Sequence, residues 1–248
     1  MDTIATTPDQ QKRKTRTESI IRQLKKTYPH ARIILRYRTP WELLVAVVLS
    51  AQCTDGVVNK VTAKLFIKYK EFDDYVQANI HEFEQDIRQS GFYRSKARNI
   101  LASAKIIAAE YRGRVPDTMD ELTALPGIAR KSANIILSNA YGKIEGIAVD
   151  THVLRLSQRL RLIDIERIGG RDRAVFSSNG TSVVDFTKDA DPVKIERELM
   201  AVIPKSDWFR FPYLLIDHGR AICNARNPAC RGCIIRALCP SSRVSMET

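Results

Sequence analysis

The sequence lacks an apolar run long enough to cross a membrane. Its longest uninterrupted run is residues 43–49, far short of the roughly 20 residues that a transmembrane helix needs. The N-terminal segment MDTIATTPDQQKRKTR also lacks the apolar stretch of a secretory signal peptide. These absences predict a soluble, intracellular protein with no signal peptide and no membrane partner.

Alternation of apolar and polar residues, the pattern of a half-buried strand, is nearly absent. We predict an all-α fold, with helices at 17–30, 40–52, 55–69, 72–79, 80–89, 95–113, 117–124, 130–141, 150–160, 192–202, 208–222 and 232–238. The exception is 174–186, where Asn179-Gly180 lies between two apolar runs, a common hairpin signal. We interpret 164–190 as an inserted loop with room for a small hairpin.

Acidic residues are missing between Gly219 and Met246, a segment that holds five arginines. Over the whole chain, 40 Lys and Arg stand against 28 Asp and Glu, which gives a net charge of +12. This excess favours a polyanionic partner but does not distinguish DNA from RNA. Residues 1–16 are polar and basic, and we predict that they form a flexible tail.

Cysteine is rare outside one short segment. Cys53 lies far from the others in the sequence, and we interpret it as an ordinary small buried residue. The other four follow the pattern Cys223-x6-Cys230-x2-Cys233-x5-Cys239. In an intracellular chain this clustering favours metal ligands over a disulfide framework. Four thiolates can hold a structural zinc ion or a [4Fe–4S] cluster, and the spacing alone leaves both open.

A lysine follows a Pro-Gly turn in the segment LPGIARK at 125–131. A helix that begins after such a turn points its first backbone N–H groups outward, and these groups with Arg130 can bind phosphate. Lys131 would lie in the first helical turn, where the positive end of the dipole and partial burial favour a neutral amine. A Schiff-base nucleophile requires a neutral amine. Taken alone, the segment is equally compatible with a surface lysine that touches phosphate.

An aspartate ends the short apolar run GIAVD at 146–150. Asp150 can cap a helix that starts at Thr151. Alternatively, its carboxylate can stabilise developing positive charge and accept a proton during catalysis. The presence of both Lys131 and Asp150 favours the catalytic interpretation.

LPGIARKSANIIL at 125–137, AVDTHVLRLSQRL at 148–160 and the four-cysteine segment resemble the endonuclease III family of DNA glycosylases. LLVAVVLSAQCTD at 43–55 and GFYRSKARNI at 91–100 resemble the same family, in the same order. The resemblance covers roughly residues 18–162 and 192–240. It implies a two-domain helix-hairpin-helix fold with a cleft between the domains. The parts would be a six-helix domain at 31–145, an iron–sulfur domain at 146–248 carrying the 164–190 insertion, and an N-terminal helix at 17–30 packed on the latter.

The resemblance implies a base excision repair enzyme that removes oxidised pyrimidines from duplex DNA. Lys131 would attack C1′ of the damaged nucleotide, expel the base and form an imine. Loss of the 2′ proton would then cut the strand 3′ to the lesion, with Asp150 supporting both steps. Adenine-specific relatives usually lack this lysine, so its presence favours a glycosylase with lyase activity. The alternatives are a monofunctional glycosylase for mismatched adenine, thymine or uracil, and a non-catalytic DNA-binding module.

The resemblance also implies DNA contacts and a cofactor. Gln52 and Phe92 would fill the gap left by the extruded nucleotide. The alternative interpretation is structural: Gln52 is then a polar residue at the C-terminus of a helix, and Phe92 is an aromatic residue of the core. The four cysteines would hold a [4Fe–4S] cluster, and the protein would act as a monomer in the cytoplasm or at the nucleoid. The other expected DNA contacts are Leu125, Pro126, Gly127, Ala129, Arg130, His152, Arg155 and Arg226.

Ala129 departs from the family's pattern, because most relatives have a second glycine at this position. A left-handed backbone there would cost an alanine about 1 kcal/mol. A right-handed backbone would remove that cost.

Overall fold

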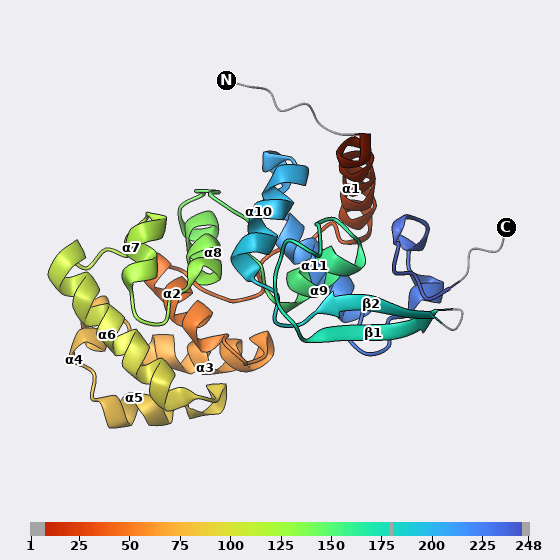
Figure 1. Cartoon of the computed structure of the whole chain (residues 1–248). Coiled ribbons are helices and arrows are strands. Elements are labelled where there is room, and N and C mark those ends of the chain that lie inside the picture. The colour runs from red at the N-terminus through yellow and green to blue at the C-terminus, as the bar shows by residue number, and fades with distance from the viewer. Residues whose placement is uncertain (1–7, 179–180, 245–248) are drawn as a thin grey trace, which may run out of the picture. The chain divides into compact units, whose positions relative to one another are not determined.

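The computed structural model describes residues 8–178 and 181–244 and divides the chain into two compact units. One unit is Ile33–Glu145, and the other joins the chain before Ile33 to the chain after Glu145. In the part of the chain that is described, no helix is both long and apolar enough to span a bilayer. The fold is mostly helical, as predicted, with one two-stranded hairpin (Figure 1).

The unit Ile33–Glu145 is built around a helix that is buried along almost its whole length. α2 (Pro40–Leu49) starts at a Thr39 cap and buries residues 41–49. It packs against α3 (Asp55–Lys68), α6 (Tyr93–Tyr111) and α8 (Arg130–Ala140). The remaining elements are α4 (Phe72–Gln77), α5 (Ile80–Asp86), the 3₁₀ turn η1 (Arg88–Ser90) and α7 (Met119–Ala124). Every residue of this unit is described, and it holds seven α-helices, including the two short ones predicted at 72–79 and 80–89.

The other unit shares one core among four helices, namely α1 (Pro8–Thr27), α9 (Thr151–Arg159), α10 (Pro192–Val202) and α11 (Phe211–Ala221). A 3₁₀ turn, η2 (Lys205–Asp207), precedes α11, and two more follow it, η3 (Cys230–Gly232) and η4 (Arg236–Leu238). The helix predicted at 232–238 is therefore wrong, because the chain there makes separate single turns beside the cysteines. Buried core residues include Ile20, Ile21, Leu24, Val153, Leu156, Ile195, Leu199, Phe211, Leu214 and Leu215.

α1 begins earlier than predicted. Residues 8–16 are helical, so the prediction of a flexible tail is wrong for them, while residues 1–7 lie outside the described residues. The Arg16 guanidinium donates to the carbonyls of Arg161 (2.8 Å) and Leu238 (3.1 Å). These contacts hold the polar first turns against the unit, although the turns lack the apolar spacing from which sequence analysis recognises a helix.

The insertion at 164–190 contains an antiparallel hairpin, as its sequence suggested. β1 (Arg173–Ser178) pairs with β2 (Thr181–Thr187) (Figure 1). The register shifts between Ala174 and Val175. The expected Asn179-Gly180 turn lies outside the described residues. β2 packs against α9. The base of the hairpin is thus part of the unit's core rather than a free loop.

Candidate active site and cysteine loop

The predicted helix-hairpin-helix consists of α7, the turn at 125–129 and α8. Leu125 and Ile128 are buried, and Ile128 N donates to Leu125 O across 3.2 Å. Pro126 O accepts a hydrogen bond from Ser103 Oγ of α6 at 3.3 Å. Two buried anchors therefore hold a short stretch of exposed backbone at the start of α8.

Gly127 is required by the geometry of this turn. Its φ is +80°, and a Cβ there would lie 2.6 Å from Asn99 Nδ2. Ala129, in contrast, has φ −94° and ψ 168°, an extended conformation that any residue adopts. Ala129 is the N-cap of α8 and gives it no side-chain cap. The departure from a second glycine therefore causes no strain, and the side chain of Ala129 does not cap α8.

We expect Gly127→Ala to destabilise the unit by at least about 1 kcal/mol, because it forces a left-handed alanine against Asn99. It should also weaken binding of abasic-site DNA, since the turn must distort. Urea unfolding and fluorescence anisotropy measure the two effects. Gly142→Ala is the matched control, because Gly142 has φ +65° but nothing within 4 Å of its added Cβ. Equal DNA binding by both variants would contradict a DNA-binding role for the hairpin.

Lys131 lies in the first turn of α8, directly after Arg130. Both side chains are half-buried. Among the described residues, the Lys131 amine makes no salt bridge or side-chain hydrogen bond. An amine that has no carboxylate partner and lies near the positive end of a helix is suited to react rather than to form an ion pair.

Asp150 caps α9. Its Oδ1 accepts a hydrogen bond from Val153 N at 2.8 Å, and the side chain is half-buried. The structural role expected from the sequence is therefore present. A carboxylate has a second oxygen, so capping does not prevent Asp150 from accepting a proton or stabilising a cation.

Gln52 and Phe92 both lie at exposed turns with left-handed backbone. Gln52 follows the end of α2 with φ +51°, and Phe92 precedes α6 with φ +48°. Phe92 is 67% exposed, so it is not a core aromatic. It is also the N-cap of α6, which therefore begins earlier than the helix predicted at 95–113. A left-handed non-glycine residue costs roughly 1–2 kcal/mol, and such strain is concentrated at functional sites.

Arg155 does not face solvent as a phosphate contact would. It is 7% exposed, and its Nη2 donates to Cys223 O at 3.0 Å and lies 3.2 Å from His152 Nδ1. The guanidinium is therefore engaged with the cysteine loop, and the DNA contact of Arg155 stays a prediction. His152 is half-buried, whereas Arg226 is exposed on that loop.

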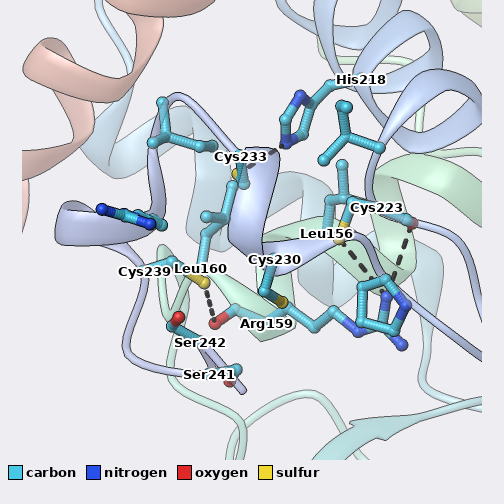
Figure 2. Close-up of a pocket in the computed structure, with 14 residues that line it drawn as sticks. Leu156, Arg159, Leu160, His218, Cys223, Cys230, Cys233, Cys239, Ser241 and Ser242 are labelled. Atoms are coloured by element: carbon cyan, nitrogen blue, oxygen red, sulfur yellow. Dashed lines mark hydrogen bonds between the residues drawn. The ribbon is translucent and has the colours of Figure 1, made fainter. Parts of the chain in front are cut away.

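The four cysteines of the 223–239 segment line one pocket (Figure 2). Their thiols are free and half-buried. Burial raises the pKa of Cys239 to about 12 and also raises the pKa of Cys233, so these thiols must lose a proton to bind a metal. No three His, Cys, Asp or Glu side chains among the described residues are grouped for a single ion. Four soft sulfur donors in a partly apolar pocket are the ligand chemistry of iron–sulfur clusters.

His218 connects α11 to this pocket. It is 1% exposed, and its Nδ1 lies 3.0 Å from Tyr28 Oη. Its Nε2 lies 3.5 Å from Cys233 Sγ (Figure 2). Burial lowers the pKa of His218 to about 4, so the ring is neutral at physiological pH. A neutral imidazole adds no charge beside the cysteine sulfurs.

Arg159 of α9 connects the cysteine loop to the hairpin. Its Nη1 donates to Cys223 Sγ (3.3 Å) and Asn224 O (2.6 Å). Its Nε and Nη2 contact the carboxylate of Asp185 on β2, and both side chains are 3% exposed. The inserted hairpin thus supplies the counter-charge for the arginine that holds the loop.

We expect Asp185→Asn to destabilise the protein by roughly 3–5 kcal/mol, because it leaves the buried Arg159 charge without its carboxylate. Urea unfolding at neutral pH measures the change. Asp172→Asn is the control within the same hairpin, because Asp172 pairs with Lys188 where both side chains are more than half exposed. That variant should lose less than about 1 kcal/mol. Similar small losses for both would show that the buried pair does not anchor the hairpin.

Sequence analysis missed Arg159 and Asp185, and it also missed a buried lysine, Lys96. Nothing in the local sequence marks Arg159 and Asp185, because each acquires its role from partners far along the chain. A charged residue on the apolar face of a predicted helix is the one available signal, and Lys96 has it: its neighbours Ala97 and Ile100 are fully buried.

Comparison with known proteins agrees with this arrangement. A family model described as HhH-GPD superfamily base excision DNA repair protein matches residues 45–167. The chain is 45% identical to endonuclease III of Synechocystis sp. over 233 residues, which are 94% of this chain and 95% of that protein. It resembles a non-covalent endonuclease III–DNA complex and a trapped endonuclease III–DNA covalent intermediate, each at 40% identity and a TM-score of 0.78. These matches cover 93% of this chain and 96% and 97% of the respective solved chains. The chain therefore belongs to the endonuclease III family, within the HhH-GPD superfamily of base excision DNA repair proteins.

Proposed function

We propose that this chain is a bifunctional DNA glycosylase and abasic-site lyase that removes oxidised pyrimidines from duplex DNA. The observation that carries the proposal is Lys131 in the first turn of the helix that follows the hairpin, where its amine has no ion-pair or side-chain hydrogen-bond partner among residues 8–178 and 181–244. Solved relatives include a trapped covalent complex between endonuclease III and DNA, which is what a nucleophilic amine would produce. We further propose that the chain acts as a monomer in the cytoplasm or at the nucleoid.

DNA is held through its phosphates. The start of α8, where Ala129 supplies no side-chain cap, and the exposed backbone of Gly127 are suited to a phosphate, and the helix dipole favours its negative charge. Arg226, Arg231 and Arg236 are exposed around the cysteine loop and add positive charge. Binding that rests on phosphate contacts weakens as salt concentration rises.

Lys131 performs the covalent chemistry. Its Nζ attacks C1′ of an extruded nucleotide, the C1′–base bond breaks, and the base leaves with the bonding electrons and takes up a proton. Opening of the sugar ring and loss of a proton from nitrogen give an imine between Nζ and C1′. Removal of a proton from C2′ then expels the 3′ phosphate, which cuts the strand 3′ to the lesion, and water finally releases the lysine.

Asp150 assists through its charge and its basicity. While the base departs, its carboxylate stabilises the positive charge that develops on the sugar. It then receives a proton from the attacking amine or from C2′. The hydrogen bond to Val153 N fixes the carboxyl group for both tasks.

The target sugar is inaccessible within stacked duplex DNA, so the nucleotide must be turned out of the helix. The exposed Gln52 and Phe92 fill the gap, and the Phe92 ring compensates for lost base stacking. Their left-handed backbone presents each side chain at the tip of its turn.

We propose that Cys223, Cys230, Cys233 and Cys239 hold a [4Fe–4S] cluster. When bound, this group crosslinks the loop, and the arginines on the loop then need less ordering when DNA binds. We expect aerobically purified protein to contain about four iron and four sulfide per chain, and Cys230→Ala to lose both together with loop stability. Elemental analysis and urea unfolding measure this. One zinc per chain and no sulfide would contradict the proposal.

Borohydride trapping on abasic-site duplex tests the function as a whole. Reduction of an imine fixes the protein to DNA, so we expect a covalent complex and strand cleavage. Tight binding without a trapped complex would favour a monofunctional glycosylase or a non-catalytic DNA-binding module. A panel of duplexes with single defined lesions, including mismatched adenine, thymine and uracil, identifies the preferred base.

A further inference from the structure

Lys96 is a lysine buried in the core of the unit Ile33–Glu145. It lies on α6 and is 4% exposed. Burial lowers its pKa, while the nearby Cys53 thiol opposes that shift. Residues of this type are almost never fully buried unless they are paired. The salt bridges found among the described residues do not include Lys96, so its position must be explained by other partners.

Those partners are two backbone carbonyls from separate segments. Lys96 Nζ donates to Leu49 O at 2.8 Å and to Ser90 O at 2.7 Å. Leu49 is the last residue of α2, and Ser90 is the last residue of η1. The final carbonyls of a helix have no partner inside it and lie at the negative end of its dipole. One amine therefore caps two helical segments at once.

Each capped segment leads directly into one of the exposed turns. Gln52 follows Leu49 by three positions, and Phe92 follows Ser90 by two. Both have left-handed backbone, with φ of +51° and +48°. The Lys96 backbone N–H also donates to Phe92 O at 3.2 Å. Fixing the two carbonyls to one nitrogen fixes the starting points of both turns relative to each other.

We propose that Lys96 is a positioning residue that sets the two gap-filling turns as one rigid pair, so that Gln52 and Phe92 enter the duplex together when a nucleotide is extruded. This inference rests on the proposed function, because it needs DNA extrusion to matter. Lys96 acts through the turns and touches neither the sugar nor the base. It should therefore affect extrusion and leave imine chemistry unchanged.

Two substrates separate these steps. A duplex that carries an oxidised pyrimidine requires extrusion, whereas a single-stranded oligonucleotide that carries an abasic site has no stack to open. Lys96→Met keeps the side-chain stem and removes both hydrogen bonds. We expect it to slow single-turnover cleavage of the duplex by on the order of 10²-fold, the usual effect of an ångström-scale misplacement. Cleavage of the single strand should stay unchanged, and Lys96→Arg, which can still donate to both carbonyls, should restore most of the duplex rate.

Lys105→Met is the matched control, because Lys105 is an exposed lysine on the same helix, and it should cleave both substrates normally. A variant that combines Lys96→Met with Gln52→Ala and Phe92→Ala should cleave the duplex as fast as the variant with the two alanine changes alone. If Lys96→Met does not fold, Lys96→Gln takes its place with the same expectations.

Equal losses on both substrates by a folded Lys96 variant would overturn the inference, because they would indicate general structural damage. Normal duplex cleavage, or fully additive losses in the combined variant, would overturn it as well. Failure of the proposed function would look different, since wild-type protein would then form no trapped adduct with either substrate.

Discussion

Lys131→Ala should abolish the borohydride-trapped complex and lower strand cleavage at an abasic site by about 10³-fold or more. Alanine has no nucleophile, and removing the group that forms the covalent intermediate removes that reaction path rather than slowing it. DNA binding should be almost unchanged, because the hairpin backbone and Gly127 remain in place. Single-turnover cleavage, trapping and anisotropy on the same abasic duplex measure the three quantities.

Lys143→Ala is the control for this variant. Lys143 belongs to the same unit, and its pair with Asp117 is exposed, so its loss should change little. If Lys131→Ala gave as much trapped complex as the wild-type protein, another amine would be the nucleophile. Loss of DNA binding in parallel with cleavage would mean that the lysine only contacts phosphate.

Asp150→Asn should lower the rate of base removal by about 10²-fold while leaving stability nearly unchanged. Asparagine caps a helix as well as aspartate does, so the bond to Val153 N can persist. It carries no charge and accepts no proton, so both proposed catalytic contributions are lost. Single-turnover kinetics on a lesion duplex and urea unfolding separate the two roles.

Asp150→Ala completes the comparison. It should lose the same activity and, in addition, about 1 kcal/mol of stability through the missing cap. A fully active Asp150→Asn would show that the residue only starts α9. In that case the carboxylate would have no part in the chemistry.

The local features of the fold could be predicted because they depend on neighbours in sequence. A Pro-Gly turn between two helical patterns indicates a hairpin, and Gly127 indeed has positive φ. The Asp150 cap and the hairpin inside 164–190 follow from equally local rules.

Features that depend on distant partners could not be predicted. The early start of α1 depends on Arg16 and carbonyls more than 140 residues away along the chain. Arg155 has the same local spacing as a phosphate contact, yet it turns toward Cys223 O. A long charged side chain can reach several partners, and the local sequence does not show which one it contacts. The partner is fixed only when the tertiary structure brings the carbonyls and counter-charges close.

The left-handed turns at Gln52 and Phe92 show a third kind of limit. Propensity does not predict strain, since neither residue type favours positive φ. The resemblance to a known family identified these positions. In the structure, the residues that precede the two turns have carbonyls that accept hydrogen bonds from Lys96.

Peptide mapping of the reduced complex tests the central claim most directly. The protein is trapped on abasic duplex with borohydride, digested with nuclease and protease, and analysed by tandem mass spectrometry. We expect a deoxyribose remnant on the Nζ of Lys131. A remnant on the N-terminal amine or on a different lysine would contradict it.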